Sequence, residues 1–150
     1  MKRVMLCSLL LLLAFPLKVY ARVPVEDNVK SVKSTSSETY TDEEITSIAD
    51  VVYTESNNQS EMGKRLVIDV ILNRVDNETF PNTVQEVLSQ KGQFSKYSYG
   101  QPLDDIIVLV KEEIDERTNE DVLFFKKNGY HSFGEPILKE GAHYFSGLEE

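Results

Sequence analysis

The sequence has a single cysteine, Cys7, and no tryptophan. Cys7 lies within an apolar run, Val4–Phe15, that follows two basic residues, Lys2 and Arg3. A basic start followed by a short apolar run is typical of a secretory signal peptide, and this run is too short to span a bilayer comfortably. We expect residues 1–21 to be removed when the protein is secreted, and an uncleaved anchor is the alternative. The secreted chain would then contain no cysteine, which excludes disulfides and a Cys–His nucleophile.

Basic residues are also scarce. The chain has 16 Lys and Arg against 25 Asp and Glu, a formal charge of −9, and loss of the three basic residues in 1–21 would take this charge to −12. An acidic surface repels phosphate backbones, so we expect no nucleic acid partner.

Histidine is present only twice, as His131 and His143, and neither belongs to a His-x-x-x-His or His-Glu-x-x-His motif. A catalytic zinc site needs about three protein ligands. We therefore expect no metal and no cofactor, and a metal site made from both histidines and a carboxylate is the alternative. The sequence also lacks the Gly-x-Ser-x-Gly motif that marks many serine hydrolases.

Residues 22–40 are polar and have no apolar period, which predicts a flexible linker before a single domain over 41–150. Helical periodicity dominates the first part of that domain, and short apolar segments between turn residues follow it. The sequence therefore predicts an α+β domain, mainly helical, with a small β-rich C-terminal portion. The predicted helices are 41–56, 60–75, 83–90 and 103–117, and the predicted strands are 121–126 and segments within 131–147.

One carboxylate interrupts the apolar pattern of the first helix. The stripe of this helix consists of Ile45, Ile48, Ala49 and Val52. Continued by one turn, the stripe reaches Glu55. A carboxyl group partly removed from water resists ionisation, and an acid that stays protonated near neutral pH can protonate a leaving oxygen. The alternative is a helix-end glutamate that turns into solvent or caps a neighbouring backbone group.

The residues after Glu55 form a series of short motifs. In order, the motifs are Glu55-Ser56, Gly63, Asn73-Arg74-Val75, Phe80-Pro81-Asn82-Thr83-Val84 and Gln93-Phe94-Ser95. Through them, residues 44–97 resemble the SleB-type cell-wall hydrolase family, which contains spore-cortex lytic enzymes and related proteins. The resemblance implies a lysozyme-like catalytic domain that cleaves the glycan strands of peptidoglycan.

The resemblance also implies that Glu55 is the catalytic general acid/base of a lytic transglycosylase or a muramidase. In lytic transglycosylation the acid protonates the bridging oxygen, and the muramic C6 hydroxyl then attacks to give a 1,6-anhydro product. The two-carboxylate scheme of hydrolysis needs a second acid. The nearest candidates are Glu61 and Asp76, which we expect to be solvated charges at helix ends.

Sugar recognition requires hydrogen bonds to acetamido and hydroxyl groups and stacking on sugar faces. The predicted substrate-binding residues are Asn73, Gln93, Ser95, Tyr97 and Tyr144. Asn73 projects from an otherwise apolar helix face, and it could equally satisfy the backbone of a loop. Arg74 and Phe94 are expected to be structural.

Two departures from the family pattern keep other functions open. Gln59 stands where family members often carry a second glutamate, and a C-terminal Gly-Trp-Asp-Pro-type segment is absent. The alternatives are a peptidoglycan-binding module with weakened catalysis and a metal-dependent N-acetylmuramoyl-L-alanine amidase. We expect a monomer in the cell wall or envelope. Because an anionic wall repels an acidic domain, we also expect an activating or localising protein partner.

Overall fold

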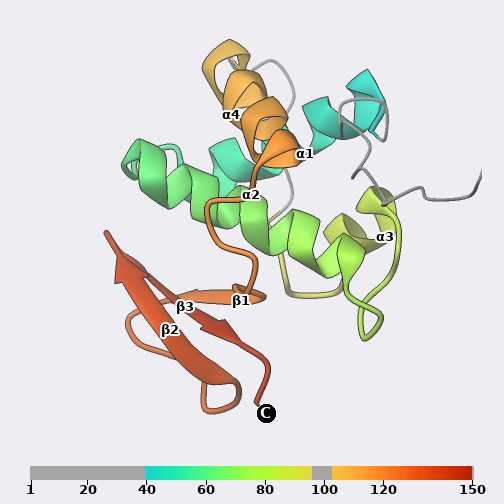
Figure 1. Cartoon of the computed structure of the whole chain (residues 1–150). Coiled ribbons are helices and arrows are strands. Elements are labelled where there is room, and N and C mark those ends of the chain that lie inside the picture. Colours follow the sequence, from blue (N-terminus) through green and yellow to red (C-terminus); the bar gives the residue numbers. More distant parts are fainter. Residues whose placement is uncertain (1–39, 96–102, 150) are drawn as a thin grey trace, which may run out of the picture. The chain divides into compact units, whose positions relative to one another are not determined.

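Four helices are followed by a three-stranded antiparallel sheet in the computed structural model, which describes residues 40–95 and 103–149 (Figure 1). The predicted signal peptide, the predicted linker up to residue 39, and Tyr97 lie outside the described residues. The prediction of a mainly helical α+β domain is confirmed. The elements are α1 (Asp42–Ser56), α2 (Glu61–Asp76), α3 (Val84–Ser89), α4 (Asp104–Asp115), β1 (Phe124–Lys127), β2 (Glu135–Glu140) and β3 (His143–Gly147).

Side-chain caps fix where the first three helices begin. The Thr41 hydroxyl accepts the backbone N–H of Glu44, and the Glu44 carboxylate accepts the backbone N–H of Thr41 at 2.9 Å, which completes the expected capping box. Ser60 caps α2, and Thr83 caps α3. Each of these residues lies directly before an apolar periodic segment, so the helix starts could be predicted from local sequence.

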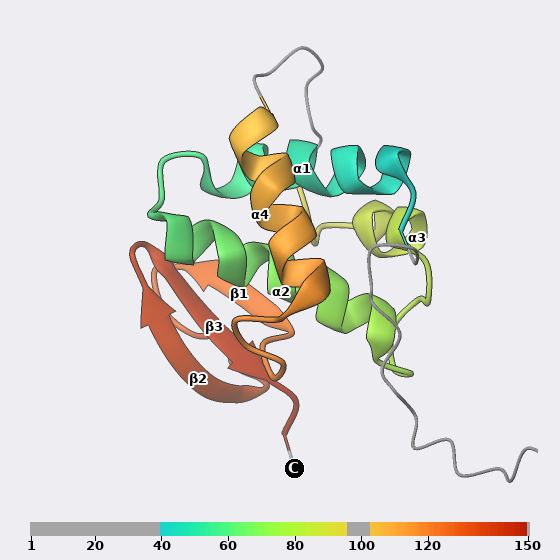
Figure 2. The same ribbon diagram turned by 45° about the horizontal axis from the view of Figure 1, so that its top comes forward.

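The core is built around α2, whose apolar residues are buried almost completely. Leu66, Val67, Ile68, Val70, Ile71 and Leu72 are each at most 1% exposed. In both views the other helices gather on one side of α2 and the sheet lies along its other side (Figures 1 and 2). Phe145 of β3 is 0% exposed and joins the same apolar cluster.

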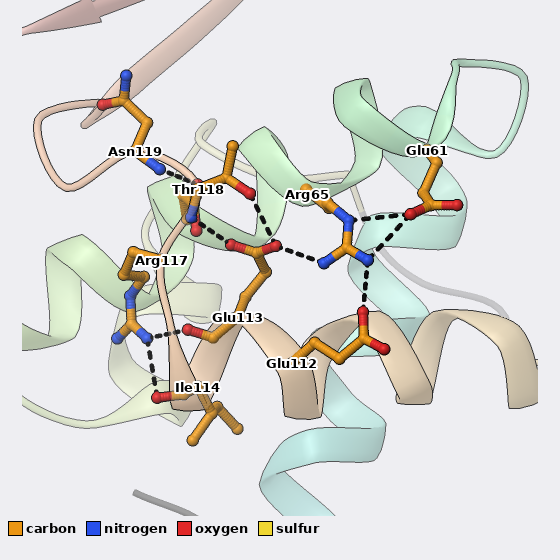
Figure 3. A network of polar contacts seen from close by, with 9 residues as sticks. Glu61, Arg65, Glu112, Glu113, Ile114, Arg117, Thr118 and Asn119 are labelled. Atoms are coloured by element: carbon orange, nitrogen blue, oxygen red, sulfur yellow. Dashed lines mark hydrogen bonds and ion pairs between the residues drawn. The ribbon is translucent and has the colours of Figure 1, made fainter.

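A network of charged side chains joins α2 to α4 (Figure 3). Arg65 of α2 pairs with Glu61, with Glu112 and with the fully buried Glu113, to which its distance is 2.8 Å. Glu113 also accepts a hydrogen bond at 2.6 Å from the backbone N–H of Thr118. The network therefore fixes both the packing of the two helices and the chain that leaves α4.

Strand β1 begins at Phe124, three residues later than predicted. The side-chain Oδ1 of Asn119 accepts the backbone N–H groups of Asp121 and Val122 at 2.9 and 3.1 Å. These bonds form a local turn that competes with strand pairing. Leu123 still donates its backbone N–H to Ser146 at 2.9 Å, so pairing with β3 starts directly after the turn.

The strands are ordered β1–β3–β2, and the register places Phe125 opposite Phe145 and Lys127 opposite His143. Successive strand residues point to opposite faces. His143 and Phe145 therefore share the face that meets the helices, and Tyr144 points to the other face. Within the described part of the chain, no helix has the length and apolar character needed to cross a membrane.

Candidate active site

Glu55 lies in the last turn of α1, where the helix gives way to the loop that leads into α2. The side chain is half-buried, and its Oε1 accepts the backbone N–H of Ser95 at 2.6 Å. The C-terminal end of a helix carries partial negative charge, so α1 itself does not stabilise a carboxylate there. A carboxyl group that a substrate can reach, and that a backbone N–H holds in one orientation, can exchange a proton with that substrate.

Ser95 reaches Glu55 because Arg74 holds the segment before it. Arg74 of α2 is 3% exposed and donates to the side-chain oxygens of Gln90 and Gln93 at 3.2 and 3.0 Å, and to the carbonyl of Leu123 at 2.7 Å. Its guanidinium also lies 5.0–5.4 Å from the ring centroids of Phe80, Phe94 and Phe124.

Burial lowers the pKa of Arg74 to about 10, which still leaves the guanidinium charged at neutral pH. The Gln93 side chain is therefore engaged with a buried cation, although Gln93 was predicted to bind sugar. Ser95 is exposed beside Glu55, and its predicted substrate contact stays a prediction.

Asn73 is 7% exposed and donates its amide to the carbonyls of Asn119 and Val122, both at 2.9 Å. Of its two expected roles, this geometry favours the bond to a loop backbone. The turn that precedes β1 is thus held to α2.

Tyr144 lies on the face of the sheet opposite to that of His143 and Phe145. Its ring contacts that of Tyr130 at 5.1 Å, and the Lys139 ammonium lies 5.2 Å from its centroid. These contacts lie on the sheet face that points away from the helices, and the predicted substrate contact of Tyr144 stays a prediction. Tyr97 lies outside the described residues.

Gln59 connects the loop after Glu55 to the β2–β3 turn. Its Oε1 accepts the backbone N–H of Ala142 at 3.0 Å, and its amide donates to Asn58 at 2.8 Å. Beside it, the Ser60 hydroxyl donates to Glu140 at 2.7 Å. Gln59, which departs from the family pattern, therefore connects the β2–β3 hairpin to the loop that follows α1.

His143, which the sequence analysis considered only as a metal ligand, lies buried at the start of β3. It is 0% exposed, and its ring centroid lies 5.1 Å from that of Phe125 and 6.1 Å from that of Phe145. Burial lowers its pKa, the charge of Lys127 lowers it further, and the charge of Glu55 acts in the opposite direction. The alternation of His143 with the core residue Phe145 is the signal that could have placed His143 on the inner face.

The two carboxylates considered as partners of Glu55 are held elsewhere. Glu61 pairs with Arg65 at 2.9 Å, and Asp76 pairs with Arg117 at 3.0 Å. Both carboxylates are about two-thirds exposed, at 67% and 65%. They are the solvated helix-end charges that the sequence predicted.

The two histidines lie against opposite faces of the sheet. The His131 ring lies 6.2 Å from that of Phe124, whereas His143 contacts Phe125, and these neighbouring strand residues point in opposite directions. Among residues 40–95 and 103–149, no three His, Cys, Asp or Glu side chains are grouped to hold a metal ion.

Two solved structures share this arrangement of elements. The catalytic domain of the Bacillus cereus SleB protein is 25% identical, with a TM-score of 0.67 over 77% of this chain and 98% of that one. The catalytic domain of the germination-specific lytic transglycosylase SleB from Bacillus anthracis is 28% identical, with a TM-score of 0.63 over 71% of this chain and 96% of that one. The fold is therefore that of the SleB catalytic domains.

The profile of the Cell Wall Hydrolase family matches residues 58–146, more than half of the sequence. The chain belongs to the cell wall hydrolase family. The matched segment starts just after Glu55 and includes Arg74, Ser95 and His143. A comparison with curated protein sequences gives no significant match.

Proposed function

We propose that this enzyme cleaves the glycan strands of peptidoglycan by lytic transglycosylation, with Glu55 as the general acid and base. The observation that carries the proposal is the half-buried Glu55 carboxyl at the end of α1, held at 2.6 Å by the backbone N–H of Ser95. The likeness to a SleB domain described as a lytic transglycosylase supports the choice of reaction.

In the first step, protonated Glu55 gives its proton to the bridging glycosidic oxygen while the bond from that oxygen to the muramic C1 breaks. The resulting carboxylate accepts the Ser95 N–H. In the second step, the muramic C6 hydroxyl attacks C1 and transfers its proton to Glu55. One carboxyl group serves both steps, which agrees with the ion pairs that hold Glu61 and Asp76 elsewhere.

A muramidase would need a second carboxylate to activate water, and the two candidates, Glu61 and Asp76, pair with Arg65 and Arg117. A zinc-dependent amidase would need about three ligands around one ion, and His131 and His143 lie against opposite faces of the sheet. A binding module with weakened catalysis would bind the glycan without releasing products.

Action on peptidoglycan corresponds to an extracellular or envelope location. We propose that residues 1–21 direct secretion and that the enzyme is a monomer. We also propose that an activating or localising partner brings this acidic domain, of charge −12 after loss of those residues, to the anionic wall.

The test is digestion of purified peptidoglycan by the wild type, Glu55→Gln and Glu61→Gln, followed by mass analysis of the muropeptides. We expect 1,6-anhydro products from the wild type and from Glu61→Gln. Glu55→Gln should lose activity by at least about a hundredfold, the lower end of the usual contribution of a general acid.

Glu61→Gln is a matched control because it removes a nearby carboxylate whose partner is Arg65. Wild-type activity in Glu55→Gln would overturn the catalytic assignment. Hydrated reducing ends would identify a muramidase, and free peptides with intact glycans would identify an amidase.

A further inference from the structure

The imidazole of His143 is buried without a polar partner. The residue is 0% exposed, and neither Nδ1 nor Nε2 has a hydrogen-bond partner among the described residues. Its packing neighbours are the rings of Phe125 and Phe145. A buried polar group without a partner destabilises the folded state, and a phenyl ring would suit these neighbours equally well. Packing alone therefore does not require a histidine here.

Charged residues face His143 from three elements. Lys127 of β1 and Glu140 of β2 are its cross-strand partners, and Glu55 of α1 acts on the ring through its negative charge. Lys127 is exposed, and Glu140 accepts the hydroxyl of Ser60. Of the three, Glu55 is the group that the proposed reaction cycles between acid and carboxylate.

Contacts on both sides bring His143 to the end of α1. On one side, the backbone N–H of Ala142 donates to Gln59 of the loop that follows Glu55. On the other side, His143 contacts Phe125, and the Phe125 ring lies 6.2 Å from that of Phe94. Phe94 directly precedes Ser95, whose N–H holds Glu55. His143 is thus linked, through Ala142 on one side and Phe125 on the other, to the two segments that border Glu55.

We propose that His143 is a positioning residue for Glu55: the neutral imidazole N–H, which has no partner in the described part of the chain, becomes a hydrogen-bond donor to the Glu55 carboxylate that forms on proton transfer. The inference rests on the proposed function of Glu55. With the Ser95 N–H, the imidazole N–H gives the carboxylate two donors. It also orients the carboxylate to take the proton of the C6 hydroxyl as the new bond to C1 forms. The imidazole keeps its own proton throughout, so the step adds no co-reactant.

The same geometry gives the reaction a dependence on acid. Burial and Lys127 disfavour the imidazolium, so His143 is neutral at neutral pH. When acid protonates the ring, it places a positive charge among the apolar rings of Phe125 and Phe145, which destabilises the imidazole in the position from which it donates to Glu55. Activity should therefore fall as the pH drops below the ordinary range of histidine.

The experiment compares full-length wild type with His143→Phe and His143→Gln on purified peptidoglycan. The measured quantities are kcat, KM, the pH profile and the thermal midpoint. His143→Phe should lower kcat by roughly ten- to a hundredfold with little change in KM, because it loses alignment of the reacting groups. Its thermal midpoint should equal or exceed that of the wild type. His143→Gln retains an N–H donor, so it should recover most of kcat while lacking the acidic fall in activity.

Phe145→Leu is the matched structural control, since it trims a buried neighbour on the same strand face. It should lower the thermal midpoint and leave kcat and the pH profile unchanged. The proposal is overturned if His143→Phe keeps the wild-type kcat and the wild-type fall in activity at acidic pH. It is also overturned if His143→Gln loses as much kcat as His143→Phe. If His143→Phe does not fold, the kcat of His143→Gln and its activity at acidic pH test the proposal without it. Full activity of Glu55→Gln would instead overturn the proposed function itself.

Discussion

Arg74 shows how one residue connects Glu55, the proposed catalytic acid, to the core. It is a buried cation surrounded by side-chain amides, a carbonyl and three aromatic rings. The planar guanidinium satisfies these partners in several directions at once, which a lysine ammonium cannot do. Through Gln93 and Phe94, this residue sets the position of the Ser95 N–H and hence the orientation of Glu55.

Arg74→Lys should therefore reduce stability and activity together. Loss of two hydrogen bonds to a charged group should lower the free energy of unfolding by about 3–6 kcal/mol, and displacement of Ser95 should lower kcat. Urea denaturation and turnover on peptidoglycan measure the two effects. Arg117→Lys, which changes an arginine that pairs with Asp76, should lower stability without affecting kcat. Equal effects of the two variants on kcat would contradict the positioning role of Arg74.

For single residues, sequence periodicity identified Glu55 because this glutamate interrupts the apolar stripe of the first helix. The same reasoning found that Asn73 projects from α2 but left its partner open. The partners of Gln93 and His143 could not be predicted, because each depends on contacts between segments distant in the sequence. The bond between Gln59 and Ala142, for example, joins residues 83 positions apart.

Among the elements, the β2–β3 turn depends on a glycine. Gly141 has φ 54°, and a Cβ at this position would lie 2.3 Å from Oε1 of Gln59. Glycine adopts this left-handed conformation without steric cost, whereas other L-residues do not. The turn can therefore approach the loop after α1 closely enough for Ala142 to donate to Gln59.

Gly141→Ala should lower the free energy of unfolding by about 1–2 kcal/mol from the left-handed conformation, and it should displace Gln59. Gln59→Ala removes the side chain that meets the new methyl group. The double variant should therefore be more stable than the sum of the single effects predicts, as measured by a double-mutant cycle in urea. Strict additivity would show that the two residues do not interact.

Helix starts were predictable at the element scale because caps and apolar stripes are local signals. The start of β1 was not, because the Asn119 turn takes up two backbone N–H groups that the strand pattern assigned to the sheet. A side chain that bonds nearby backbone groups can replace ladder hydrogen bonds without changing the apolar pattern.

Across the whole molecule, stability depends on a buried carboxyl pair between α2 and α4. Burial and the neighbouring Glu113 raise the pKa of Asp69 to about 8, although the N–H of Asn119 and the charge of Arg117 lower it in part. Burial also acts to raise the pKa of Glu113, but hydrogen bonds from Asp69, Arg65 and Thr118 lower it overall. The folded protein therefore keeps a proton on Asp69 that the unfolded chain releases near pH 4.

Where the folded state binds the additional proton, stability falls as pH rises, by up to about 1.4 kcal/mol per pH unit for one proton. The contribution of Asp69 is fully present below about pH 4 and is lost as pH rises to about 8. Asp69→Asn supplies a permanent donor to Glu113 and should flatten this dependence. Urea denaturation between about pH 5 and 8 measures the slopes, and identical slopes for variant and wild type would contradict the shared proton.

The most direct test of the central claim is digestion of peptidoglycan in heavy-oxygen water by the wild type and Glu55→Gln. Intramolecular transfer uses the C6 hydroxyl of the sugar, so wild-type glycan ends should be 1,6-anhydro and free of label. Glu55→Gln should release no products at matched enzyme concentration. Labelled reducing ends from the wild type, or unlabelled anhydro products from Glu55→Gln at the wild-type rate, would contradict the account.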